Sequence, residues 1–476
     1  MNKLLVKFKS ASPAVKASMA LLFANIILKG ISLISGPIFT RIMPTEQYGI
    51  VSTFTSWQSL FNVIVTLNLA SGAFNNGMLD FKDDRDVFQF SLVTISTVTS
   101  LLFLAVVIAL RSVVLNLLEL PELSIYLMFL HFLFVPAYDF WSGRQRYEFK
   151  YKALSLITIG HAILALVIGL LVVLNIDSSK AAIGRICALE SVSIAIGAFF
   201  FFYLGKNARF KVNLQYCVYA LKFNVPLLPH YLSMYVLSSS DRIMITKMIN
   251  SSATAIYSVA YTVASVITII WQSIEASLSP WIYEKLNEGE KNSVRKLTAD
   301  IVLLFAVMCL GCTLLAPEIM KVLAPVSYSA GIYVIPPVAA GVFFTAIYSI
   351  YMRIELFYKQ TDFATIATTL AAALNVVLNY VFIRICGAVA AGYTTMICYA
   401  LLALLHYLNV RKKGFSDIIN NKMFMSFSAA VVIGVIVISL LYNYLVIRII
   451  LIMTAGVLVF WKRKTIIGLI KMKKRL

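Results

Sequence analysis

The sequence consists of long apolar segments that follow one another with only short polar loops between them. Lipid offers no partner for an unpaired backbone N–H or C=O group, so such segments cross a membrane as helices of about 20 residues. A water-soluble globule is excluded because 60% of the 476 residues are hydrophobic and only 13% are charged, which leaves too few polar groups to cover its surface. The sequence predicts an all-α, polytopic membrane protein with about 14 transmembrane helices.

We place the expected spans at the limits of the apolar segments. They cover residues 16–42, 48–75, 87–110, 122–141, 151–174, 181–204, 217–246, 253–283, 297–317, 331–354, 362–384, 387–409, 423–442 and 444–461.

The basic residues alternate along the chain in a way that predicts its orientation. Of the 41 Lys and Arg residues, 30 fall in every second gap between spans or in the terminal segments, and eight lie on the opposite face. Because basic loops stay in the cytoplasm, this split predicts that both termini are cytoplasmic. The net charge of +20 is spread over separate loops, so we expect membrane lipids and not nucleic acid as its partner. The basic tail 462–476 is expected to contact lipid.

Enzymatic motifs are absent from the sequence. There is no P-loop, no Gly-rich nucleotide turn, no H-E-x-x-H and no G-x-S-x-G, and all expected loops are short. The six cysteines fall in or at the ends of apolar spans, which favours neither a disulfide framework nor a zinc site. We therefore expect a transporter without a cofactor, driven by an ion gradient or by the gradient of its cargo.

A weak internal repeat divides the chain. Shifting the sequence by 206 residues aligns 41–56 with 247–262, and six spans separate the two copies, so both have the same orientation in the membrane. We expect an N-lobe over 1–205, a C-lobe over 212–412, and a terminal helix pair with the basic tail over 420–476.

Three stretches carry a resemblance to a known family: residues 28–57, 238–261 and 373–395. They resemble the polysaccharide-transporter branch of the multidrug/oligosaccharidyl-lipid/polysaccharide (MOP) exporter superfamily, and most of all the Wzx-type flippases of O-antigen and capsule repeat units. The resemblance implies a V-shaped pair of six-helix lobes around a cationic cavity, which carries undecaprenyl-diphosphate-linked oligosaccharide to the outer leaflet of the bacterial cytoplasmic membrane. It also implies a polysaccharide polymerase and a chain-length regulator as candidate partners.

Four cations are the predicted diphosphate-binding set: Lys29, Arg41, Lys222 and Arg242. A charged side chain within the bilayer costs roughly 2.5–3.5 kcal/mol, so such residues usually face protein or water and serve function. Both Lys and Arg bind phosphate oxygens by charge-assisted hydrogen bonds. The alternative for Arg41 and Arg242 is that they extend to the interface from span ends.

A second set of residues suits the binding of a coupling ion, Na⁺ or H⁺. Asn375 and Asn379 lie four residues apart on one helix face, and with Asp241 they offer oxygen ligands to a hard cation. A lipid-II flippase relative uses carboxylate and amide groups on the corresponding helices for sodium, although this chain has Asn379 where a second carboxylate would strengthen the case. The alternative is that the asparagines join helix to helix. Glu275 and Asp139 are the alternative proton carriers.

One further pair of charged residues suits a structural role. Arg185 and Glu190 lie five residues apart on one span, nearly on one face, where they can neutralise each other.

Two other functions fit the same sequence class. One is a multidrug exporter of the same superfamily, whose small cationic cargo an excess of Lys and Arg in the cavity would disfavour. The other is a membrane polymerase or ligase acting on lipid-linked sugars, which usually carries its catalytic residues in a large external loop.

Overall fold

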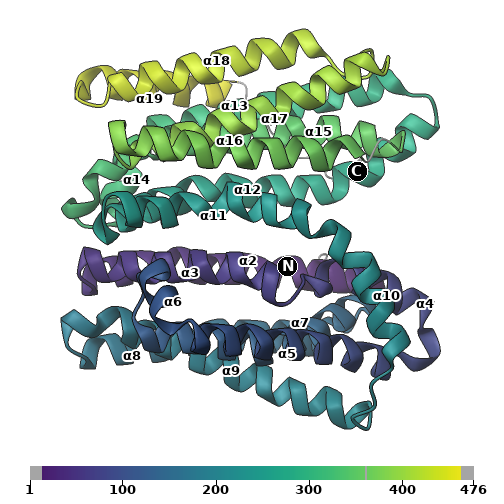
Figure 1. Ribbon diagram of the computed structural model, residues 1–476. Coiled ribbons are helices and arrows are strands. Elements are labelled where there is room, and N and C mark those ends of the chain that lie inside the picture. Colours follow the sequence, from purple (N-terminus) through teal and green to yellow (C-terminus); the bar gives the residue numbers. More distant parts are fainter. Residues whose placement is uncertain (1–12, 360–361, 462–476) are drawn as a thin grey trace, which may run out of the picture. The chain divides into compact units, whose positions relative to one another are not determined.

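The computed structural model describes residues 13–359 and 362–461, and every regular element in these ranges is a helix (Figure 1). The predicted all-α class is confirmed. Within the described residues, 11 helices are long and apolar enough to cross a membrane. The basic tail 462–476, for which we expected lipid contact, lies outside the described residues.

The chain forms two compact units, Met1–Tyr235 and Val236–Leu476. The border between them lies inside helix α11, and the lobe boundaries expected from the sequence stay a prediction. The helices of the first unit are α2 Pro13–Ile42, α3 Thr45–Val65, η1 Leu69–Ser71, α4 Ala73–Asp80, η2 Lys82–Asp84, α5 Arg85–Ala109, α6 Arg111–Leu118, α7 Glu122–Tyr147, α8 Tyr151–Asn175, η3 Ser178–Lys180, α9 Ala181–Asn207, α10 Leu214–Asn224 and η4 Val225–Leu227.

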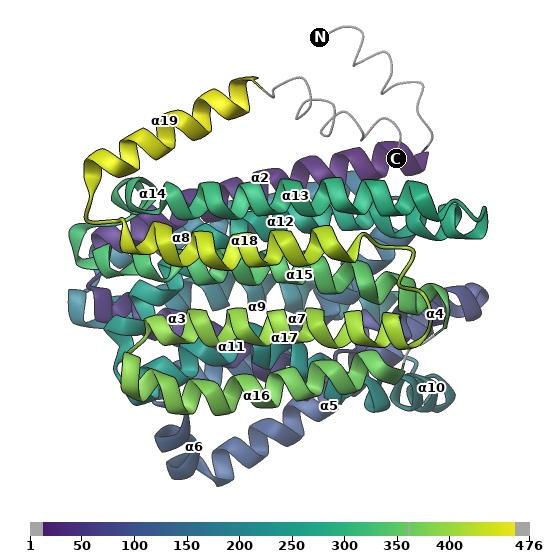
Figure 2. The same cartoon turned by 90° about the horizontal axis from the view of Figure 1, so that it is seen from above.

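The second unit begins within α11 and is built on the same plan of long antiparallel helices. Its helices are α11 Leu228–Met248, α12 Ser251–Asn287, α13 Lys291–Leu314, α14 Ala316–Leu323, η5 Val326–Tyr333, α15 Ile335–Phe357, α16 Asp362–Cys386, α17 Val389–Lys412, α18 Asn421–Leu440 and α19 Leu445–Trp461. In Figure 2, the axis of α19 runs at an angle to the axis of α18, the helix that precedes it in the chain.

The predicted span 48–75 is too long. Helix α3 ends at Val65, and Leu67 and Asn68 have φ angles of 54° and 46°, in the left-handed region. Few L-residues favour that region, and it cannot continue a right-handed helix. The chain therefore turns after α3 and enters the short helix α4.

The predicted span 217–246 is broken in two. Helix α10 ends at Asn224, the short helix η4 contains Pro226, and α11 begins at Leu228. Proline has no N–H to donate and its ring clashes with the preceding turn, which explains the break. Helix α10 packs against α4 and α5 of the first unit.

Asn224 connects this break to the turn after α3. Its side chain is fully buried, with Oδ1 accepting from the backbone N–H of Ala73 at 2.8 Å. Its Nδ2 donates to the carbonyl oxygens of Leu67 at 3.0 Å and Asn68 at 2.8 Å. The bonds to Ala73 and Leu67 satisfy backbone groups at the turn, and the bond to Asn68 adds to the one that its carbonyl accepts from the Ser71 N–H. A Cβ on Gly72 would lie 2.4 Å from Asn224 Oδ1, so only glycine fits there.

In the first unit, α7 lies in the centre and packs against α5, α8 and α9. Pro136 interrupts the hydrogen bonding of α7 and frees the carbonyl of Phe132, which instead accepts from Ser100 Oγ of α5 at 3.0 Å. Gly197 of α9 permits a close approach to α7, since a Cβ there would lie 2.8 Å from the Phe134 carbonyl carbon.

In the second unit, α15 is the central helix. It is the most thoroughly buried of the candidate spans and packs against α12, α13, α17 and α18. Helix α16 packs against α17. A helix with no polar face suits this position, because every side of α15 meets another helix.

Candidate functional site

The predicted ion-coupling residues of the second unit lie together around Asp241. This carboxylate is only 1% exposed. Its Oδ2 accepts from the Tyr257 hydroxyl at 2.5 Å and from Thr395 Oγ1 at 2.9 Å, and its Oδ1 accepts from Asn379 Nδ2 at 2.8 Å. Helices α11, α12, α16 and α17 each supply one of these groups.

Asn375 completes the network one turn from Asn379. Its Oδ1 accepts from Asn379 Nδ2 at 3.1 Å and from Ser240 Oγ at 3.3 Å, and its Nδ2 donates to Thr395 Oγ1 at 3.2 Å. Thr394 donates to the Asn379 amide oxygen. The i, i+4 spacing thus places both amides beside Asp241, as expected, while their role in ion binding stays a prediction.

The charge of Asp241 is surrounded by neutral donors. None of the ion pairs among the described residues includes it, and the neighbouring Arg242 points elsewhere. The Arg242 guanidinium donates to the Ser238 carbonyl at 3.0 Å and lies 4.3 Å from the ring centre of Tyr261. A half-turn of the Asn379 amide would present its carbonyl oxygen to the site. Carboxylate, amide and hydroxyl oxygens are the ligand set of a hard cation, so the residues present fit such an ion.

The first unit contains a polar cavity of about 710 Å³. Its lining residues are Asn62, Thr66, Asn68, Leu69, Ala70, Ser71, Asn75, Ser96, Pro136, Asp139, Phe140, Ser142, Gly143, Arg146, Tyr147 and Tyr235. Most of their polar groups are neutral amides and hydroxyls, and Asp139 and Arg146 are the charged members. Ser96 Oγ is buried and has no hydrogen-bond partner within residues 13–359 and 362–461. A cavity with this lining suits a hydrophilic, largely uncharged ligand that donates and accepts hydrogen bonds.

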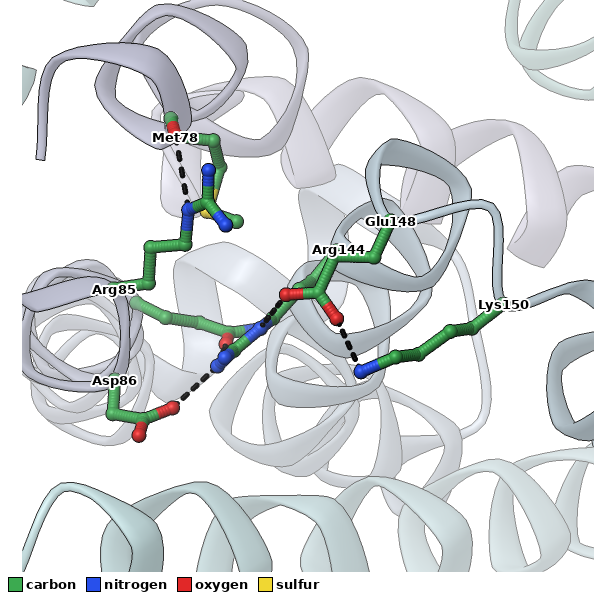
Figure 3. Close-up of polar contacts among 7 residues, drawn as sticks. Met78, Arg85, Asp86, Arg144, Glu148 and Lys150 are labelled. Atoms are coloured by element: carbon green, nitrogen blue, oxygen red, sulfur yellow. Dashed lines mark hydrogen bonds and ion pairs between the residues drawn. The ribbon is translucent and has the colours of Figure 1, made fainter. Parts of the chain in front are cut away.

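An ion-pair network lies at the end of α7 next to this cavity (Figure 3). Arg144 binds Asp86 of α5 and also donates to Glu148 at 2.8 Å, and Lys150 pairs with the same Glu148 at 2.6 Å. Burial alone would raise the pKa of the Glu148 carboxyl, but Lys150 and Arg144 outweigh it and hold that pKa below its ordinary value. Arg85 donates to the Met78 carbonyl at 3.1 Å and joins α5 to α4, while the ion pairs join α5 to the end of α7 and to the turn before α8.

The four predicted diphosphate-binding cations are divided between the units. Lys29 and Arg41 are exposed on α2, and Arg41 donates to the Pro37 carbonyl at 2.9 Å. Lys222 is exposed on α10. The expected span 217–246 would put Lys222 and Arg242 on one helix, but the break at Pro226 leaves Lys222 on α10 and Arg242 on α11. The role of Lys222 in phosphate binding stays a prediction.

The two alternative proton carriers lie in different surroundings. Asp139 is exposed to the cavity of the first unit. Glu275 of α12 pairs with Arg353 of α15 at 2.8 Å and accepts a hydrogen bond from Ser349. Arg353 already compensates the charge of Glu275. A proton or another cation would be favoured at Glu275 only after Arg353 is displaced or neutralised.

The expected neutralisation of Arg185 by Glu190 does not occur. Arg185 lies over the ring of Phe39, 3.8 Å from its centre, whereas Glu190 bonds to His131 at 2.7 Å and to Gln58 at 3.0 Å. Five residues correspond to 500° of helix rotation, so the two side chains diverge and each meets a different helix.

Sequence reasoning also missed a second buried carboxylate. Glu355 of α15 bonds to His406 and Asn409 of α17. The only signal in the sequence is a lone Glu near a span end, and its partners lie 51 and 54 residues further along the chain. Tyr257 and Thr395 around Asp241 were missed for the same reason.

The chain matches one known family and several solved structures. The sequence matches the model of a family described as polysaccharide biosynthesis protein over residues 14–285, which is more than half of the chain. A search of curated proteins finds no match.

Among solved structures, the chain resembles the lipid II flippase MurJ in an inward closed conformation. The TM-score is 0.66 at 16% identity, over 95% of this chain and 100% of the flippase. It also resembles an inward-facing multidrug resistance MATE transporter, with a TM-score of 0.59 at 13% identity over 84% of this chain and 98% of that one. A MOP superfamily transporter from Pyrococcus furiosus matches with a TM-score of 0.51 at 13% identity, over 87% and 98%.

These identities are low, so the structural likeness speaks for the fold alone. The family match confirms the polysaccharide family that residues 28–57 and 238–261 indicate, and the solved structures confirm the expected fold. The chain belongs to the polysaccharide biosynthesis protein family and is a multi-pass membrane protein with the fold of the MOP transporters.

Proposed function

We propose that this chain is a flippase that carries undecaprenyl-diphosphate-linked oligosaccharide repeat units from the cytoplasmic to the outer leaflet by alternating access. The polar cavity of the first unit is the observation that carries the proposal. A volume of about 710 Å³ lies within the range of about 300–1,000 Å³ typical of ligand pockets.

The physical problem of such a flippase is the sugar headgroup. A hydroxyl group moved into an apolar medium without a partner costs roughly 2–7 kcal/mol, and a repeat unit carries many hydroxyls. Asn62, Asn75 and Ser71 offer amide and hydroxyl partners within a bundle of apolar helices. The polyprenyl tail needs no such partner and stays in the lipid.

The diphosphate needs cations in addition to neutral donors. We assign this role to Lys29, Arg41, Lys222 and Arg242, of which the first three are exposed and Arg242 is half-buried. Charge-assisted hydrogen bonds from Lys and Arg are roughly twice as strong as neutral ones.

The coupling ion, Na⁺ or H⁺, would bind at Asp241. One solved structure with this fold is the lipid II flippase MurJ. In this chain, occupation by a cation would offset a buried negative charge that only neutral groups now contact. A site of this kind would respond to an ion gradient.

The cell location proposed here is the bacterial cytoplasmic membrane, with both termini in the cytoplasm. The excess of Lys and Arg on one face supports this orientation. Fusions of a periplasm-active phosphatase to the two termini should be inactive, and active fusions would contradict the orientation. A polysaccharide polymerase and a chain-length regulator would use the delivered repeat units.

The proposal is tested in cells that lack this protein. Undecaprenyl-linked repeat units should accumulate with their sugars exposed only to the cytoplasmic face, and the wild-type gene should restore export. Replacing Lys29 and Lys222 by Ala should abolish rescue while expression persists. The control is Lys180→Ala, an exposed lysine outside the proposed set. An unchanged distribution of repeat units would contradict the flippase assignment.

A further inference from the structure

A buried acid and a buried base meet between α15 and α17 of the second unit. Glu355 is 1% exposed and His406 is 0% exposed. His406 Nδ1 lies 2.7 Å from Glu355 Oε2, and Asn409 Nδ2 donates to Glu355 Oε1 at 2.8 Å. Each carboxylate oxygen therefore has one partner.

The charge of this cluster depends on one proton. With a neutral imidazole, the cluster carries the full negative charge of Glu355 inside the helix bundle. Burial of an uncompensated charge is costly, whereas a paired and hydrogen-bonded charge is tolerated. A second proton on the imidazole makes the cluster neutral overall, since imidazolium and carboxylate then balance.

The atom that would take this proton is identifiable. A neutral imidazole that donates from Nδ1 to Glu355 leaves a free lone pair on Nε2. His406 Nε2 is buried and has no hydrogen-bond partner among the residues that the structure describes. The ring is held between Tyr348, stacked at 5.9 Å, and Phe363, edge-on at 5.7 Å, so it is fixed in orientation.

The neighbouring charged and titratable groups have other partners. Arg353 of α15 pairs with Glu275 of α12. The Tyr351 hydroxyl donates to Asn421 of α18 at 2.7 Å, and Tyr348 stacks on Tyr399 of α17. Among the described residues, the ion pairs of Glu355 include His406 alone.

The first unit contains a similar pair on the corresponding helices. The shift of 206 residues that relates the two halves of the sequence places α7 over α15 and α9 over α17. His131 of α7 and Glu190 of α9 also bond at 2.7 Å, with acid and base exchanged between the helices. An acid–base bridge between these two helices thus occurs in both units.

The cluster is separate from the Asp241 network but shares a helix with it. Thr394 and Thr395 of α17 contact Asn379 and Asp241, and His406 and Asn409 lie further along the same helix. A change of charge at His406 therefore acts on the helix that completes the proposed cation site.

We propose that Glu355 and His406 form a proton-binding site of the second unit, distinct from the ion-coupling residues at Asp241. A proton from water adds to the Nε2 lone pair and forms one N–H bond, and on release that bond breaks and the proton returns to solvent. No other bond changes. The site stands whether or not the cargo is a lipid-linked sugar, so it goes beyond the proposed function.

The full-length protein in lipid nanodiscs, labelled with ¹⁵N-histidine, provides the test. The chain has only four histidines, so the spectrum of His406→Gln identifies the signals of His406. In the wild type these signals should change reversibly from neutral imidazole to imidazolium as the pH is lowered across the range in which the protein stays folded. In Glu355→Gln the imidazolium signal should be lost over the same range.

A control variant separates the specific effect from local damage. Tyr351→Phe removes a buried hydrogen bond of α15 but leaves the acid–base pair, and its His406 signals should titrate as in the wild type. A wild-type His406 that stays in one protonation state over this range overturns the proposal without any variant. Normal titration in folded Glu355→Gln overturns the role of Glu355.

Discussion

Asp241 is a buried carboxylate held by neutral donors, and this determines how it can act. The hydroxyls of Tyr257 and Thr395 and the amide of Asn379 orient it but leave its charge uncompensated. Neutral donors stabilise an anion less than a cation does. A site of this composition should gain stability when a cation enters.

Replacement of Asp241 by Asn removes the charge and keeps the shape. We expect transport by Asp241→Asn to lose its dependence on a Na⁺ or H⁺ gradient, with a fall of about tenfold or more in the driven rate. Transport into vesicles with and without each gradient measures this. Asp417→Asn, which removes an exposed partner of Lys291, serves as the control and should keep the dependence. A gradient response in Asp241→Asn equal to that of the wild type would exclude Asp241 as the coupling residue.

Glu148 makes a second residue-scale prediction, on pH. Its pKa in the folded protein lies below its ordinary value, so it stabilises the fold at neutral pH. This stabilisation is complete above about pH 4.3, the ordinary value for glutamate, and is lost as the pH falls through the lower value of the folded state. Thermal unfolding of Glu148→Gln should show a lower midpoint than the wild type at pH 7, and the two midpoints should converge in acid. A difference that is independent of pH would contradict this.

The sequence predicts part of this residue-level picture. Helical spacing places Asn375 beside Asn379, and an acid within a span marks Asp241, because both features are local. Tyr257, Thr395 and the Glu355–His406 pair escape prediction since each contact joins helices far apart in the chain. Their neighbours follow from packing, which no local pattern encodes.

Element boundaries are well predicted wherever hydrophobicity determines them. All but two of the expected spans coincide with a single helix of similar limits. In the exceptions, 48–75 and 217–246, backbone conformation ends the helix inside the expected span. Two residues with positive φ follow the end of α3, and Pro226 prevents α10 from continuing into α11 as one helix. Apolar composition shows where a chain can cross lipid, but not where it turns.

Asn224 should be essential to the contact between the turn after α3 and the break that separates α10 from α11. Asn224→Ala leaves the N–H of Ala73 and the carbonyl of Leu67 without the side-chain partner that they have, and leaves the Asn68 carbonyl with the Ser71 N–H alone. We expect the free energy of unfolding to fall by about 2–4 kcal/mol. Asn175→Ala removes one exposed hydrogen bond within α8 and should change it by less than about 0.5 kcal/mol. Equal effects of the two variants would show that this contact has no special role.

Gly197 tests the close packing of α7 and α9. An added Cβ would lie 2.8 Å from backbone atoms of Phe134 and Val135, so Gly197→Ala must push the two helices apart. We expect a loss of about 1–3 kcal/mol in the free energy of unfolding. Gly160→Ala on α8 has open space around it and should be neutral or slightly stabilising. A neutral Gly197→Ala would mean that the helices are not packed this closely.

For the molecule as a whole, the sequence predicts the class of fold and the superfamily. Apolar periodicity, charge alternation and the resemblance of residues 28–57 lead to the same MOP architecture that the solved structures share. The position of the polar cavity could not be predicted, because it arises where α3, α4, α5 and α7 meet and its Asn and Ser residues lie on separate helices. The sugar it would accept is encoded in that surface and not in the hydrophobic pattern.

The central claim is that this chain moves a lipid-linked oligosaccharide across a bilayer. The most direct measurement uses vesicles that contain the purified protein and a polyprenyl-diphosphate-linked oligosaccharide, with a glycosidase added outside. The enzyme reaches only outer-leaflet sugars, so the protein should expose the inner-leaflet pool to cleavage and leave a free dye inside the vesicles retained. An inner-leaflet pool that stays protected, as in vesicles without protein, would contradict the account.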